Sequence, residues 1–400
     1  MALLGIEDPS ARKQGKTALG VHPLLALGFR PFYLLAAAFA AVSVPVWLAK
    51  YYGGAAGLAH VDMFWHMHEM VFGFVIAVII GFLYTAGRNW SGLWTPRGGT
   101  LAAIGLLWIA GRVAMCTAAP PLAAAIDFVF IPVAAWPLYR VLKRAGNKRN
   151  LVLVVLLSLL AAANAVFHAA RIGWLDISPL PAVQAAIIIV VIIETMIGGR
   201  VIPGFTANAV PGVKPVTNEK RDRVMVVLTV GAGLAWVCGA PAVLSAALAV
   251  GAAIAQAIRL LGWKPFRTVH NPLLWILHAS YAWIPLGLLL LGLAALGIVS
   301  DSAAFHALAV GSTAGLILGM ITRTALGHTG RALKAGPSET VMYALIQVGA
   351  IARLVAAIDT DGLRNAALVL AAVCWSSAFV LYLAVYGPYL FRARVDGREG

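Results

Sequence analysis

The sequence predicts an all-α polytopic membrane protein with about twelve transmembrane helices and with both chain ends in the cytoplasm. Of its 400 residues, 61% are hydrophobic and only 11% are charged, whereas soluble domains are about one quarter charged. So few charges cannot cover a surface of this size in water. The apolar runs are continuous instead of alternating with period two, which favours spanning helices of ~20 residues over a β-barrel.

Polar and proline breakers between the apolar runs set the expected spans. In chain order they cover residues 32–52, 63–86, 99–117, 122–142, 151–172, 180–199, 224–239, 242–261, 272–296, 302–324, 340–358 and 363–390. The sequence therefore predicts a cytoplasmic segment at 1–29, a single transmembrane domain at 30–390 and a cytoplasmic tail at 391–400.

The net charge of +15 does not indicate nucleic-acid binding, because the basic residues occupy alternate loops. This is the positive-inside pattern. The basic positions are Arg12, Lys13, Lys16 and Arg30; Arg88 and Arg97; Lys143, Arg144, Lys148 and Arg149; Lys214, Lys220, Arg221 and Arg223; Lys264 and Arg267; Arg331 and Lys334; and Arg392, Arg394 and Arg398. The intervening loops hold Asp62, Asp176, Asp301, Asp359 and Asp361. Both chain ends are thus expected on the cytoplasmic side.

A His-x-His-Glu cluster opens the second span, at His66, His68 and Glu69. Residues i and i+2 of a regular helix point about 200° apart. One metal therefore cannot take both histidines from such a helix, although each could serve a different centre. The alternative is a pair of interfacial histidines hydrated at the membrane boundary.

Two further histidines are expected at a similar depth, on the outer side of the membrane. His168 ends the fifth span and His306 begins the tenth. A histidine alone is more often structural, but neutral imidazole is a common ligand of haem iron and copper. If the helices are neighbours, His66, His68, His168 and His306 form a haem or metal site.

A second polar group is expected toward the cytoplasm. It comprises Glu194, Arg200, His278 and His328. Glu194 lies in an otherwise apolar helix, which suits either a proton carrier or the counter-ion of an arginine. Arg112, in the third span, could bind a haem propionate or extend toward the membrane surface.

Four motifs resemble the NnrS family over residues 22–389. They are Gly28-Phe29-Arg30-Pro31-Phe32, Trp65-His66-Met67-His68-Glu69-Met70, Gly199-Arg200-Val201-Ile202-Pro203 and Gly327-His328-Thr329-Gly330-Arg331. The resemblance implies a bacterial inner-membrane protein that contains haem b, with copper as a second metal, and that acts in nitric-oxide stress and denitrification. It carries over His66, His68, Glu69, Arg200 and His328. No two histidines are adjacent, unlike the pattern of haem–copper oxidases.

The leading hypothesis is a haem protein that binds nitric oxide and reduces or detoxifies it as a reductase-like oxidoreductase. Electrons would come from quinol or another external donor in the lipid bilayer. A secondary transporter and a non-catalytic haem or copper sensor or metal-delivery protein are the alternatives. The expected roles are Glu69 and Glu194 for catalytic proton transfer; His66, His68, His168, His306, Arg112 and Arg200 for cofactor binding; and His66, His68, His278 and His328 for metal.

Overall fold

The computed structural model describes residues 20–54, 57–359 and 362–399, and within these ranges the chain is helical and contains no strand. The α-helices are α1 (Phe29–Tyr51), α2 (Met63–His68), α3 (Ile76–Ser91), α4 (Gly98–Thr117), α5 (Pro120–Arg144), α6 (Lys148–Arg171), α7 (Leu180–Ala209), α8 (Glu219–Val237), α9 (Ala242–Gly262), α10 (Pro272–Ala295), α11 (Asp301–His306), α12 (Gly315–His328), α13 (Pro337–Ile358) and α14 (Arg364–Phe391). Two π-helical segments, η3 (Glu69–Val75) and η5 (Ala307–Ala314), and two 3₁₀ turns, η2 (Pro23–Leu25) and η4 (Pro265–Arg267), complete the described elements.

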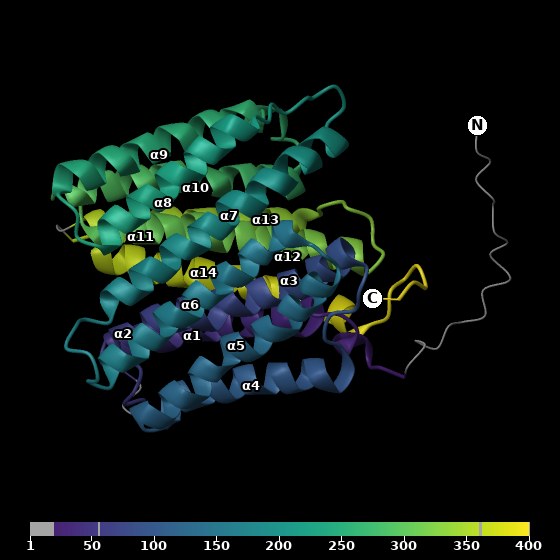
Figure 1. Cartoon of the computed structure of the whole chain (residues 1–400), viewed down its shortest axis with the longest axis horizontal. Coiled ribbons are helices and arrows are strands. Elements are labelled where there is room, and N and C mark those ends of the chain that lie inside the picture. Colours follow the sequence, from purple (N-terminus) through teal and green to yellow (C-terminus); the bar gives the residue numbers. More distant parts are fainter. Residues whose placement is uncertain (1–19, 55–56, 360–361, 400) are drawn as a thin grey trace, which may run out of the picture.

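These elements form twelve helical rods, because α2, η3 and α3 are continuous and so are α11, η5 and α12. The rods lie roughly parallel in one bundle (Figure 1). Eleven of them are long and apolar enough to cross a membrane. The twelfth, α8, begins with charged residues from Glu219 to Arg223, and its apolar part is correspondingly short. The predicted all-α polytopic fold is confirmed.

The expected spans agree with the rods except at a few ends. The largest difference is α7, which was expected to end at residue 199 and instead continues through Pro203 to Ala209. Membrane helices tolerate proline when neighbouring groups satisfy the freed backbone. Pro203 has no N–H for the carbonyl of Gly199, four residues earlier, yet α7 continues for six residues beyond it. The motif from Gly199 to Pro203 therefore lies inside a helix and not at its end.

Each π-helical segment begins directly after a histidine. Segment η3 follows His68 and η5 follows His306. A π-helical turn holds an extra residue, so it changes the directions of the side chains on either side of it, and such turns are frequent at functional sites. One of these histidines, His68, lies in a buried polar cluster, and the other, His306, lines a cavity.

Arg30 joins the beginning of α1 to the end of α14. Its side chain is fully buried and donates to the carbonyls of Tyr389, Leu390 and Arg392 at 3.4, 3.0 and 2.8 Å. These carbonyls end a helix and have no partner within it. The arginine of the first motif is thus a structural cap, and α1 begins on the same side of the bundle on which α14 ends (Figure 1).

Chain ends on one side agree with the predicted topology, whereas the cytoplasmic assignment of that side stays a prediction. The predicted N-terminal segment 1–29 is described only from residue 20. Four charged positions used in the topology argument lie outside the described residues: Arg12, Lys13, Lys16 and Asp361.

The topology can be tested at the two ends of α6. Ala145 and Asp176 are exposed in the loops that precede and follow this helix. With the three native cysteines replaced by serine, we expect a membrane-impermeant maleimide to label Asp176→Cys in intact spheroplasts, and Ala145→Cys only after permeabilisation. Labelling of both positions from one side would contradict the crossing of α6 and the predicted orientation.

Candidate functional site

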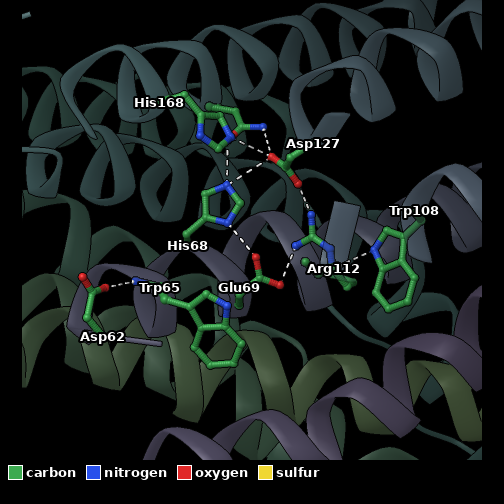
Figure 2. Close-up of polar contacts among 10 residues, drawn as sticks. Asp62, Trp65, His68, Glu69, Trp108, Arg112, Asp127 and His168 are labelled. Atoms are coloured by element: carbon green, nitrogen blue, oxygen red, sulfur yellow. Dashed lines mark hydrogen bonds and ion pairs between the residues drawn. The ribbon is translucent and has the colours of Figure 1, made fainter. Parts of the chain in front are cut away.

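A buried polar cluster joins four helical rods (Figure 2). Isolated charges within a bilayer are costly, so helices that carry them pack with the charges together. The cluster consists of His68 at the end of α2, Glu69 in η3, Arg112 on α4, Asp127 on α5, and Asn164 and His168 on α6, and all six are buried.

Arg112 is the centre of this cluster. One end of its guanidinium, Nη1, donates to Glu69 Oε2 at 2.7 Å, and the other, Nη2, donates to Asp127 Oδ1. Gly73 leaves room for the arginine, because a Cβ there would lie 2.6 Å from Arg112 Nη1. The other oxygen of Asp127 accepts from Asn164 Nδ2 at 2.8 Å and lies 2.9 Å from His168 Nε2. One guanidinium therefore holds two buried carboxylates.

Both ring nitrogens of His68 face acceptor oxygens. Nδ1 lies 2.9 Å from Glu69 Oε1, and Nε2 lies 2.9 Å from Asn164 Oδ1. The amide orientation of Asn164 is set by its donation to Asp127, which leaves its oxygen for the histidine. This pattern matches an imidazolium with two N–H donors. The same protonation balances the cluster, because two carboxylates then meet one guanidinium and one imidazolium.

A metal ion could balance the cluster in place of that proton. Ligand atoms of His68, Asp127 and His168 all lie within 4.8 Å of one another. Two imidazoles and a carboxylate suit copper, zinc or iron. Metal binding would release the proton, since the ligating imidazole must be neutral. The triad thus accommodates either a proton or a metal.

A separate cavity of about 310 Å³ holds the other two histidines of the outer group. It lies between α1, α2–η3, α7, α11–η5, α13 and α14, and both His66 and His306 line it. The ring of His66 stacks on Trp47, with centroids 4.0 Å apart, and its buried Nδ1 has no partner among the described residues. Nδ1 of His306 donates to the Ser302 carbonyl at 2.7 Å, which leaves Nε2 with a free lone pair. Both imidazoles therefore retain a nitrogen for a ligand.

Two arginines also line this histidine cavity, Arg353 on α13 and Arg364 at the start of α14. Arg353 makes one long hydrogen bond, 3.5 Å to Ser302 Oγ, and within the described ranges no carboxylate pairs with it. A guanidinium held beside apolar walls favours an anionic ligand. Asp301 lines the cavity as well, and its carboxylate accepts from Gln184 Nε2 at 3.0 Å and from the Ser302 N–H at 2.8 Å. The cavity thus combines nitrogen ligands with two arginines.

The four outer histidines accordingly divide into two pairs. The rings of His68 and His168 lie 5.0 Å apart in the polar cluster, while His66 and His306 share the cavity. His66 and His68 face different sites, as their spacing predicts. Arg112, considered above as a propionate ligand, has two carboxylates of the protein as partners, and the arginines that line the cavity are Arg353 and Arg364.

The inner residues have separate partners. His278 Nε2 lies 2.9 Å from Thr206 Oγ1, and Arg200 donates to Asn150 Oδ1 at 2.7 Å. The His328 ring packs 5.6 Å from that of Phe29, and its carbonyl accepts from Arg394 at 2.9 Å. Among the described residues, no hydrogen bond or ring contact joins His278 on α10 to His328 on α12. The structure does not gather these residues into one centre.

Glu194 accepts a hydrogen bond from Ser312 Oγ at 2.7 Å, and among the described residues it has no arginine counter-ion. The sequence suited Glu194 either to carry a proton or to pair with an arginine. Among the described residues the arginine partner is missing, which favours the proton carrier. This carboxyl lies at the wall of a second cavity, described below.

Sequence reasoning missed Asp127, Trp47, Arg353 and Arg364. A signal for Asp127 was present, because it is the only acidic residue in the span expected at 122–142. The other three lie near helix ends, where arginine and tryptophan are common in any membrane protein. Only their convergence on one cavity distinguishes them.

The fold and these two sites define a multi-pass membrane protein with histidine and carboxylate chemistry enclosed among its helices. The sequence profile described as NnrS protein matches residues 23–394. The chain belongs to the NnrS family, so the resemblance seen in its motifs is confirmed. No curated protein matches the chain.

The charge balance around Arg112 can be tested by a double-mutant cycle. We expect Arg112→Met to destabilise the protein by about 3–5 kcal/mol, because two buried carboxylates lose their common partner. Adding Asp127→Asn should recover part of this loss, since the second unpaired charge is removed. Denaturation midpoints in detergent measure both effects. A double variant as unstable as the sum of the single variants would contradict the coupling.

Proposed function

We propose that this protein is a bacterial inner-membrane haem protein that binds nitric oxide, with the haem held in the cavity lined by His66 and His306. The observation that carries this proposal is the convergence on one cavity of two imidazoles and of Arg353, which has no carboxylate partner among the described residues. Family membership supports it, because the family is one of the nitric-oxide response.

The cavity residues fit the parts of a haem. Its volume of about 310 Å³ falls at the lower end of the ~300–1,000 Å³ typical of ligand pockets. His66 and His306 would each offer a ring nitrogen that could hold the haem iron. The Trp47 ring holds His66 by stacking, and the Ser302 carbonyl fixes the tautomer of His306. Arg353 and Arg364 are cations for the propionates.

Reduced haem, when bound, supplies an iron that takes up nitric oxide. The chain provides the setting for that step. Nitric oxide is small and uncharged and partitions into lipid, where quinol is also available as an electron donor. Reduction of nitric oxide consumes protons as well as electrons, so a proton-holding group near the cavity is required for turnover.

The two carboxyls named from the sequence differ in their suitability for proton delivery. Glu69 is held by Arg112 and His68 and lines neither cavity. Its role is to maintain the charge of the polar cluster. Glu194 lines the second cavity, and its partner Ser312 adjoins Thr313, which borders both cavities. Glu194 is therefore the better proton donor.

Copper is proposed for the triad of His68, Asp127 and His168. Support comes from the mutual distances of their ligand atoms and from the charge of the cluster, which calls for one more cation. His68 of the triad and His66 of the histidine cavity lie two residues apart on one helical rod, so a metal and a haem would be near neighbours.

The haem site predicts distinct effects for the histidines. His66→Ala and His306→Ala should each lower haem content by most of the wild-type amount, because each removes a nitrogen that would hold the haem iron. The matched control is His270→Ala, an exposed histidine just before α10. Haem content is measured as the pyridine haemochrome.

Addition of nitric oxide to the reduced wild-type protein should shift the Soret band, and the two cavity variants should weaken the shift. Haem-loaded, reduced protein without any spectral response to nitric oxide would refute the proposed function. A spectral shift without nitrous oxide formation would restrict that function to binding.

The metal site makes an independent prediction. His168→Ala and Asp127→Ala should lower copper content by about the tenfold or more typical of losing a ligand or its direct support, while haem content stays near wild type. Metal analysis of the purified protein measures this. Copper that persists in both variants, or disappears only in His66→Ala, would place the metal elsewhere.

A further inference from the structure

A second cavity, of about 100 Å³, lies between α3, α7 and α12, which run side by side near the middle of the bundle (Figure 1). Its walls are formed mostly by aliphatic and aromatic side chains, among them Val78, Phe82, Ile193 and Ile317. Three polar residues also line it: Tyr33, Glu194 and Thr313.

The polar groups of this apolar cavity are largely occupied elsewhere. Glu194 accepts from Ser312, and Thr313 Oγ1 donates to the Leu308 carbonyl at 3.1 Å. The buried hydroxyl of Tyr33 lacks a partner among the described residues. Although the Glu194 carboxyl can accept further hydrogen bonds, the wall surface that faces the cavity is almost entirely apolar, which favours an apolar occupant over an ordered water. Cavities with hydrocarbon walls stay dry and take up benzene or xenon.

The apolar cavity adjoins the histidine cavity. Val75 of η3, Val190 of α7 and Thr313 of η5 line both. Two of these three residues belong to the π-helical segments that begin directly after His68 and His306. The junction between the two cavities is therefore built from small β-branched side chains.

We propose that the apolar cavity is a binding site for a small, uncharged gas molecule, and that it passes this ligand to the histidine cavity through the junction of Val75, Val190 and Thr313. Apolar walls accept such a molecule without loss of hydrogen bonds and reject ions and water. The delivery role rests on the proposed function, whereas gas binding itself does not.

Gas binding is tested with xenon on crystals of the full chain, with or without haem. Anomalous density is expected in the apolar cavity of the wild type. Ile317→Trp should abolish that density by filling the space. The matched control, Ile254→Trp on α9, alters a side chain that is 56% exposed and should leave the density unchanged. Val78→Phe is a smaller filling change, for use if Ile317→Trp does not fold.

An apolar cavity without xenon in the wild type would overturn the proposal. So would density for a lipid or detergent chain, or for water, that persists under xenon pressure. Equal xenon density in the wild type and in the filled variant would also overturn it.

Delivery is tested by flash photolysis of carbon monoxide from the reduced haem protein. Val190→Phe at the junction should slow bimolecular recombination about tenfold, equivalent to a barrier higher by about 1.4 kcal/mol, without changing the haem spectrum. An unchanged rate would refute delivery. If xenon binds in the apolar cavity but the reduced haem protein shows no spectral response to nitric oxide, the proposed function is refuted and the gas site remains.

Discussion

The ion pairs of Arg112 with Glu69 and Asp127 are the interaction on which the candidate sites depend. They fix α4 and α5 against η3 at the point where the polar residues of α6 also converge. Buried pairs of this kind contribute little net stability over a hydrophobic core, but loss of one partner is costly. The cluster therefore specifies which helices are neighbours, and in doing so it sets the direction of the rod that carries both His66 and His68.

The π-helical segments determine which side chains of that rod face the polar cluster and which face the histidine cavity. After η3 begins at Glu69, the helix turns its charged side toward α4–α6, while His66 and the methionines of the preceding turns face the histidine cavity. Segment η5 begins directly after His306, which lines the same cavity from another helical rod. Segment η5 packs closely against α10, because a Cβ on Gly311 would lie 2.2 Å from the Trp283 ring. Local helix geometry thus separates a charged site from a mostly apolar one.

This separation suits chemistry on an uncharged molecule. The carboxylates of the charged cluster, Glu69 and Asp127, line neither cavity, and among the described residues Glu194 is the one carboxyl on the wall of the apolar cavity. The charged cluster and the apolar cavity therefore use different side chains of the same helical rod. A neutral ligand in the apolar cavity would not meet the ion pairs of Arg112.

The sequence alone determined the membrane fold, the approximate ends of the spans and the family, because hydropathy, loop charges and local motifs are properties of consecutive residues. It also indicated that His66 and His68 cannot both ligate one metal from a regular helix, since helical spacing fixes their directions. Only the tertiary structure decided that His68 pairs with His168 and Asp127, and that His66 shares a cavity with His306 and Arg353. These residues are far apart in the chain and meet through helix packing. No single-sequence pattern encodes which helices become neighbours.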